Sequence, residues 1–335
     1  MKERRTRALI HAVSGVGGSV PRMDVTEYLK QGDPAIRWQV MQDLEAAPAA
    51  DVAAERARVA AEGWGATLLG LQADDGYWDG GAYRPPWTES YANFFDTWSA
   101  THFSLQTLMD LGADPADPRV REALDRVERN VRWDYNDELY FQGEVEPCIN
   151  GVALSIGAYF GRDASRICQT LVDTQLGDGG WNCWVDDGQG VGSFHSTICA
   201  LEGLRDWESA TGGTESSREA RRRGEEYLLD RRLMRRATTG EIADPRFTLL
   251  SFPTRWYYDI LRGADYFRIA RPQRDERCAE AVDLIRSKAL PMGMWKIENE
   301  HQGASHLAFE DEAEGFPSRW VTLRALRVLR WWDAG

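Results

Sequence analysis

A near-literal repeat restricts the fold of this chain more than any other feature of its sequence. Residues 252–256 read Phe-Pro-Thr-Arg-Trp and residues 316–320 read Phe-Pro-Ser-Arg-Trp, and each pentapeptide opens an apolar segment with helical spacing. Arg37-Trp38 opens a third segment of this kind. With three similar segments, the sequence predicts helices that begin near residues 37, 97, 148, 195, 255 and 319, roughly 47 to 64 residues apart. This period is typical of repeated helical hairpins.

Two kinds of helix alternate along the chain. Apolar residues recur at helical spacing in almost every long segment, and no sustained alternating pattern of a strand is present. One kind is apolar on most sides, as in a buried helix, and the other combines charged residues with an apolar stripe, as in an outer helix. Six inner helices, each followed by an outer one, can close into a ring, whereas an open stack needs polar capping repeats. We therefore predict an all-α fold, an (α/α)6 toroid.

Composition excludes several classes of protein. The 40 Lys and Arg against 53 Asp and Glu give a net charge of −13, which opposes binding to nucleic acids. Five cysteines without dense spacing indicate a reducing, cytoplasmic setting, and no apolar run approaches the roughly 20 residues of a transmembrane helix. Residues 1–22 begin with basic residues, but Gly and Ser interrupt their apolar part. We expect a disordered leader there, a single domain over residues 23–335, and no nucleotide cofactor.

Two turns between helices share a spacing of Gln, Gly and Trp. The Q-x-x-x-G-x-W pattern resembles the turn motif of the squalene-hopene cyclase and protein prenyltransferase superfamily, whose repeats build α/α toroids. The resemblance covers roughly residues 30 to 333 and implies that the Gln and Trp side chains brace neighbouring helices. It points to a fold rather than to a chemistry. The residues concerned are Gln72, Gly76 and Trp78 in the first turn, Gln175, Gly179 and Trp181 in the second, and Gly293 to Trp295 in a weaker third copy.

The acidic motifs of the superfamily are missing. Cyclases that begin by protonating their substrate carry Asp-x-Asp-Asp, and magnesium-dependent relatives carry Asp-Asp-x-x-Asp, but this chain has neither pattern. Asp259, in the segment WYYDILRG, is the best single candidate for a catalytic general acid. Apolar surroundings raise the pKa of a carboxyl group by desolvation, although Arg255 would oppose that shift.

A zinc site is implied by a second resemblance. The segment SFHSTICALEGL, which contains His195, is similar to the zinc-histidine segment of protein prenyltransferase β subunits. Those subunits add an Asp-x-Cys, whose place Glu146-x-Cys148 would take here, with Cys183 on a loop at the same end of the ring. Carboxylate, thiolate and imidazole ligands suit tetrahedral zinc with an open position. His195 is also a candidate catalytic residue. The alternative also stands, in which both cysteines are small buried residues and His195 is a helix-capping or hydrogen-bonded histidine.

Candidate substrate-binding residues lie at the predicted starts of the inner helices. Helix amino ends attract anions, so two arginines there would together hold a diphosphate or a carboxylate. The alternative is an ion pair between Arg255 and Asp259. Aromatic faces would suit an isoprenoid chain or a carbocation, but they also serve as ordinary core residues. The candidates are Arg255, Trp256, Arg319, Trp320, Trp98 and His102.

Two classes of function follow from these patterns. The first is an enzyme related to squalene cyclases and prenyltransferases, which would act on a hydrophobic, isoprenoid-type substrate in the toroid cavity with a zinc ion or an acid group at the mouth. Glycosidases and polysaccharide lyases with (α/α)6 barrels are an enzymatic alternative, because they also use Trp platforms and paired carboxylates. The second class is a toroid that binds a ligand or a partner without catalysis.

Overall fold

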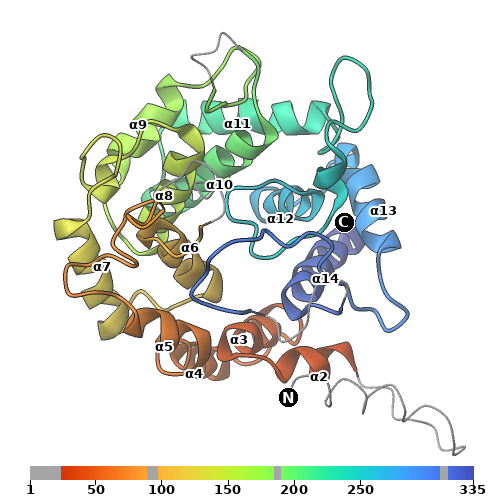
Figure 1. Cartoon of the computed structure of the whole chain (residues 1–335). Helices are drawn as coiled ribbons and strands as arrows, with labels where there is room; N and C mark the ends of the chain where they lie inside the picture. Colours follow the sequence, from red (N-terminus) through yellow and green to blue (C-terminus); the bar gives the residue numbers. More distant parts are fainter. Residues whose placement is uncertain (1–23, 89–96, 185–189, 310–315) are drawn as a thin grey trace, which may run out of the picture.

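The chain runs once around a ring of helices in the computed structural model (Figure 1). The structure describes residues 24–88, 97–184, 190–309 and 316–335, so the predicted leader lies outside the described residues. All regular elements in these ranges are helices, which confirms the all-α prediction. None of the described helices is both long enough and apolar enough to cross a membrane.

Six helices form the inner layer, and five of them begin within four residues of their predicted starts. In the described ranges, seven further α-helices and three 3-10 turns surround or connect them. The inner helices are α3 (Pro34–Asp43), α6 (Thr101–Leu111), α8 (Pro147–Tyr159), α10 (Phe194–Thr211), α12 (Ile260–Ala270) and α14 (Arg319–Ala334). The others are α2 (Val25–Lys30), α4 (Ala49–Ala57), α5 (Gly63–Gly70), α7 (Pro118–Asn130), η3 (Tyr140–Gln142), α9 (Ser165–Asp173), α11 (Glu215–Asp230), η5 (Pro245–Thr248), η6 (Glu276–Cys278) and α13 (Ala279–Ser287).

The ring closes between the first and the last inner helix. Arg327 of α14 donates a hydrogen bond of 2.8 Å to Oε1 of Gln39 on α3 and forms an ion pair with Asp43. Arg330 donates to the carbonyl oxygen of Leu44 at 2.7 Å. Because these contacts join helices that are almost 300 residues apart in sequence, the inner layer has no open end. The prediction of a closed (α/α)6 toroid is confirmed.

Helices α8 and α10 pack at backbone contact. A Cβ atom added to Gly151 would lie 2.3 Å from the carbonyl oxygen of Cys199, and one added to Gly203 would lie 2.4 Å from that of Gly151. Only glycine permits this approach. It holds the amino ends of α8 and α10 side by side, and this end of the ring is called the mouth below.

Three turns between helices repeat one hydrogen-bond pattern. The Nε2 of Gln72 donates to the carbonyl oxygens of Gly76 and Ala123 at 3.0 Å each. In each turn the indole nitrogen of the Trp donates to the carbonyl oxygen ten residues earlier, within the preceding outer helix. These turns therefore tie successive hairpins together, as the Gln and Trp residues were expected to do. The equivalent bonds are Gln175 to Gly179 and Ala220, Trp78 to Leu68, Trp181 to Leu171, and Trp295 to Ile285.

The predicted helix start near residue 255 is wrong. Arg255 has a φ of 54°, outside the right-handed helical region, and α12 begins only at Ile260. Asp259 is the N-cap of that helix and accepts a hydrogen bond from its first turn. In the second copy of the pentapeptide, Ser318 caps α14, so Arg319 is the first helical residue. The two copies therefore have different local structures.

Loops cross the centre of the ring. In Figure 1 the segment between α13 and α14 passes over the inner helices. The backbone N–H of Trp98 donates to the carbonyl oxygen of Ala304 at 2.7 Å, and Arg255 donates to Oγ of Ser305 at 3.2 Å. These contacts join three segments that are distant in sequence.

Candidate functional site

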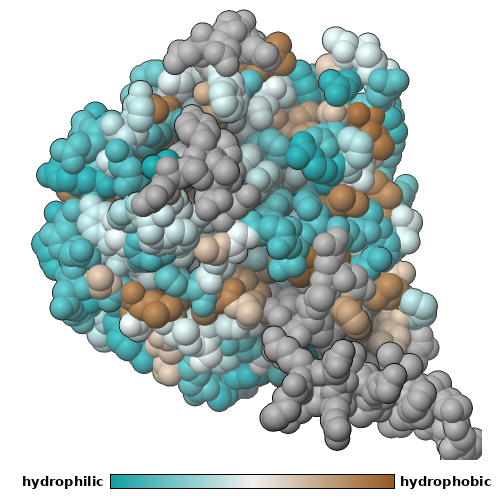
Figure 2. Space-filling view, in the orientation of Figure 1, coloured by the Kyte–Doolittle hydropathy of each residue, from teal (hydrophilic) through white to brown (hydrophobic). Residues whose placement is uncertain are grey.

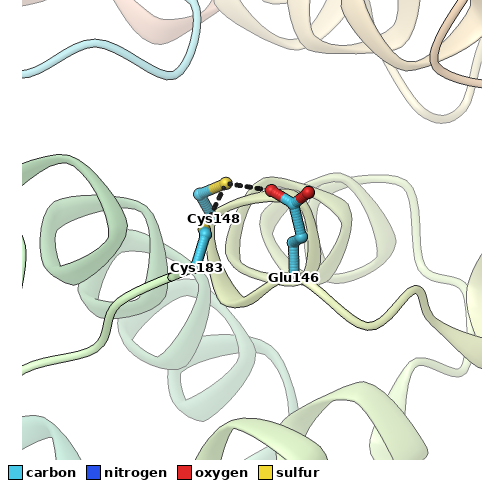
Figure 3. Close-up of side chains that lie close together, drawn as sticks. All are labelled: Glu146, Cys148 and Cys183. Atoms are coloured by element: carbon cyan, nitrogen blue, oxygen red, sulfur yellow. Dashed lines mark hydrogen bonds between the residues drawn. The ribbon is translucent and has the colours of Figure 1, made fainter. Parts of the chain in front are cut away.

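Three potential metal ligands converge at the mouth (Figure 3). Glu146 is the N-cap residue of α8, Cys148 lies in the first turn of this helix, and Cys183 comes from the loop before α10. One ligand atom from each lies within 4.8 Å of the other two. The Sγ atoms of the cysteines are 2.9 Å apart, and Sγ of Cys148 is 3.6 Å from Oε2 of Glu146. The structure thus brings together three of the four ligands expected from the sequence.

Local sequence explains this arrangement. Pro147 occupies the first position of α8, where its fixed φ favours the start of a helix and no N–H is lost from the hydrogen-bond ladder. The extended backbone of Glu146 then returns its side chain toward Cys148. On the other side, Trp181 pairs with Ser193 in a β-bridge, which holds the loop that carries Cys183 against the start of α10.

The donor set fits zinc. Two sulfur ligands and one carboxylate oxygen leave a fourth tetrahedral position open, as in catalytic zinc sites. Zinc-bound sulfurs lie about 3.8 Å apart in a tetrahedron, so the two Sγ atoms would separate by about 0.9 Å on binding. The hydrogen bond with Cys183, followed by burial, raises the pKa of the Cys148 thiol well above its ordinary value. Without a metal the Cys148 thiol is therefore protonated, and metal binding would release its proton.

His195 is oriented by the backbone rather than toward the three ligands. Its Nδ1 accepts a hydrogen bond of 2.8 Å from the N–H of Tyr258. Burial, and then the charges of Arg262 and Arg246, lower the pKa of His195 to about 4, so the ring is neutral near pH 7. A neutral ring that accepts at Nδ1 carries its proton on Nε2. That nitrogen has no free lone pair for zinc, so we remove His195 from the expected ligand set and keep it as an N–H donor.

Three neighbouring cavities lie at the mouth of the ring. The cavity beside the three ligands has a volume of about 240 Å³ and is also lined by Tyr83, Trp184, His195 and Trp256. Tyr83 and Glu146 belong as well to a second cavity of about 440 Å³, and His195 to a third of about 190 Å³. Because neighbouring cavities share these residues, they lie next to one another at the mouth, and together they are called the mouth groove below.

Asp259 is a capping residue. One carboxylate oxygen accepts from Arg262 N at 2.8 Å and the other from the backbone N–H and the hydroxyl of Ser251, at 3.1 and 2.5 Å. Its side chain is 1% exposed, and burial raises its pKa. Since both oxygens are used in holding the start of α12, the geometry gives Asp259 a structural role instead of the predicted role of general acid.

The two arginines predicted to hold an anion point to different neighbours. Arg255 is buried over the ring of Trp98, at 5.6 Å, and donates to Thr107 and Ser305. Arg319 lies over the ring of Tyr28, at 4.6 Å, and donates to the carbonyl oxygen of that residue on α2. They do not converge, because residue 255 is not helical. The alternative ion pair with Asp259 is also replaced by these contacts.

The remaining candidates divide between core and cavity. His102 is 2% exposed, its Nδ1 lies 2.9 Å from the hydroxyl of Tyr140, and burial lowers its pKa to about 3. It is therefore a neutral core histidine. Trp98 lines the third cavity of the mouth groove, and Trp256 lines the cavity beside the metal ligands. Trp320 stacks on Phe252 and is not among the residues that line that groove.

Sequence reasoning missed a polar cavity inside the ring. It has a volume of about 180 Å³ and is lined by all six inner helices, from their second halves in most cases. Gln106 and Asp110 on α6, and Glu202 and Asp206 on α10, are among its walls. The signal in the sequence was a pair of polar residues four positions apart within an apolar helix, which places both on one inward face.

Comparison with known proteins gives matches of structure alone. No protein-family model matches this chain, and no curated protein matches its sequence. Two structures of the type II terpene cyclase MstE from Scytonema, one in complex with geranylgeranyl dihydroxybenzoate and one apo, resemble it with 16% sequence identity and a TM-score of 0.42. Each match covers 90% of this chain and 87% of the cyclase chain.

Proposed function

We propose that this chain is a zinc-dependent enzyme that acts on a hydrophobic, isoprenoid-type substrate in the mouth groove. The convergence of Glu146, Cys148 and Cys183 beside an aromatic cavity is the observation that carries the proposal. A bound zinc ion would supply Lewis-acid activation of a substrate oxygen or of a water at its open position.

Side chains of the mouth groove would bind and orient the substrate. The faces of Tyr83 and Trp256 offer apolar and π contacts to an unsaturated chain. Nε2–H of His195 is available to donate a hydrogen bond to a developing negative charge, because Tyr258 occupies the other ring nitrogen. The Oγ of Ser196 lies 3.2 Å from Sγ of Cys183 and would orient this ligand.

The substrate belongs to the groove rather than to the centre of the toroid. The inner cavity measures about 180 Å³, and eight charged residues stand among its walls. A long hydrocarbon in this cavity would remove water from those charged groups, at a cost of several kcal/mol. In the view of Figure 2 the surface is mainly hydrophilic, with hydrophobic residues in separate small groups.

Carbohydrate chemistry is the second candidate, and two exposed aromatic residues favour it. Tyr135 is 79% exposed and Trp184 is 62% exposed, and each lines a cavity that also contains Glu146. Flat exposed rings beside carboxylates are typical of sugar-binding clefts. In this case the cysteines would have no catalytic role.

Metal analysis of protein purified without a histidine tag tests the proposal. We expect one zinc ion per chain, lost in Cys148→Ala and in Cys183→Ala and retained in Cys168→Ala, a control at a buried cysteine of α9. Mass spectrometry should then detect turnover of prenyl diphosphates or squalene, but not of oligosaccharides, and a zinc chelator should abolish it. An equal trace of zinc in the wild type and in all three variants would overturn the proposal. Turnover of oligosaccharides alone would favour carbohydrate chemistry, the second candidate.

A further inference from the structure

The inner cavity is separate from the mouth groove and has walls of its own. Its charged residues come from α6, α10, α12 and α14, and its apolar side chains include Met109, Phe252 and Trp320. The rings of Phe252 and Trp320 stack 4.4 Å apart at an angle of 14°. The cavity thus combines a rigid aromatic wall with polar walls, in a volume of about 180 Å³.

Most charges of the inner cavity are already paired. Arg262 donates to both oxygens of Glu202, at 2.6 Å for the shortest contact. Arg205 pairs with Asp206 at 2.7 Å, and Asp265 pairs with Arg268 at 2.6 Å. The remaining arginines are engaged as well, Arg324 with Asp265 at 3.5 Å and Arg327 with Asp43.

Asp110 is the exception. In the part of the chain that the structure describes, its carboxylate has no ion pair and no hydrogen bond, although it lines the cavity. Gln106 lies one helical turn earlier on the same face of α6 and is 6% exposed. Its Nε2 donates to the carbonyl oxygen of Arg255 at 2.9 Å, whereas its Oε1 is buried without a partner among the described residues.

Two acceptors without a direct donor therefore lie one helical turn apart on the wall of one cavity. The Oε1 of Gln106 is buried, whereas the carboxylate of Asp110 is partly exposed and interacts with Arg324, Arg262 and Arg255 only at longer range. A buried acceptor that finds no donor costs free energy, of the order of 1–3 kcal/mol for a neutral group and more for a charged one. A ligand that donates hydrogen bonds and carries positive charge would suit both acceptors, because one of them is a carboxylate. The neighbouring apolar wall requires that such a ligand also have a hydrocarbon or aromatic part.

We propose that the inner cavity is a binding site for a small organic ammonium compound. The ammonium group donates to Asp110 and to Oε1 of Gln106, and the organic part lies against Phe252 and Trp320. Cation–π attraction to these rings adds to the binding. The proposal uses no residue of the mouth groove, so it stands or fails independently of the zinc chemistry proposed there.

Calorimetric titration with butylamine and benzylamine tests the site, with 1-butanol and benzyl alcohol as neutral probes of the same shape. We expect saturable binding of an amine at one site per chain and none of the alcohols. The variant Asp110→Asn keeps the shape of the side chain and removes its charge, and it should weaken amine binding at least about tenfold.

Two controls make the result decisive. Gln106→Met retains the length of the side chain but removes the acceptor, so it should also weaken binding, whereas Asp125→Asn on outer helix α7 should leave it unchanged. Thermal unfolding identifies any variant that fails to fold. Absence of saturable amine binding to the wild type, equal binding of the alcohols, or unchanged binding in a folded Asp110→Asn variant would each overturn the proposal.

Discussion

The backbone N–H of Tyr258 and Nδ1 of His195 form a hydrogen bond of 2.8 Å across 63 residues of sequence. Tyr258 is 3% exposed, so this N–H has no access to water once its acceptor is removed. We expect His195→Ala to lower the free energy of unfolding by about 1–3 kcal/mol, the usual cost of a buried donor without a partner. Urea denaturation measures this change.

The matched variant is His195→Asn, whose amide oxygen stands near the position of Nδ1 and can accept the same hydrogen bond. It should recover much of the lost stability. Both variants should retain the zinc content of the wild type, because His195 lies outside the ligand set. Loss of zinc from His195→Ala at unchanged stability would show instead that the ring turns to bind the metal.

Removal of zinc should destabilise the protein. A metal that binds the folded state alone stabilises it by RT ln(1 + [Zn]/Kd), about 4 kcal/mol at a thousand times Kd. We therefore expect Tm to rise when zinc is added to the chelated protein, and not to rise in Cys148→Ala. Cys278→Ala, at a buried cysteine beside α13, should respond as the wild type does. An equal response in all three proteins would contradict a specific site.

Sequence patterns were enough to predict the ring of helices but not the arrangement of side chains at its centre. The inner helices at 147, 194 and 319 were predicted closely because a buried helix needs apolar residues on most sides, a requirement visible in the sequence. The same reasoning gave a wrong helix start at residue 255, because the two similar pentapeptides have different local structures. Arg255 leaves the helical region because tertiary contacts with Trp98 and Ser305 hold it, and no local pattern records them.

The candidate site was predictable to the same limited extent. Glu146 and Cys148 share one helix start, and Cys183 precedes another at the same end of the ring, so their meeting follows from topology. The orientation of the His195 ring does not follow from topology, because it depends on the hydrogen bond that the N–H of Tyr258 donates to the ring. The capping role of Asp259 could not be predicted from the sequence either, since it depends on where α12 begins.

Asp110 should make stability depend on pH. Burial raises its pKa from 3.8 to about 6, so between these values the folded state binds the proton more tightly than the unfolded state. Its contribution to stability is present at low pH and is lost as pH rises through this window. At neutral pH, Asp110→Asn should be more stable than the wild type by up to about 3 kcal/mol, an upper limit for a half-buried group.

Chemical denaturation at a series of pH values tests this expectation. The difference between Asp110→Asn and the wild type should vanish below about pH 3, where the carboxyl group of Asp110 is protonated in both the folded and the unfolded state. A constant difference across the series would mean that the carboxylate is compensated by a partner at every pH.

Gly179 links the repeated turns to the stability of the ring. Its φ is 87°, and an added Cβ would lie 2.6 Å from the carbonyl oxygen of Arg223 on the next outer helix. Gly179→Ala should therefore cost at least about 1–3 kcal/mol, from the left-handed backbone and from the clash together. Gly177→Ala in the same turn has open space around its Cβ and no positive φ, so it should be neutral or slightly stabilising. Equal Tm values for the two variants would show that the turn can shift away from α11 without loss, despite the hydrogen bond that Gln175 donates to Ala220 of that helix.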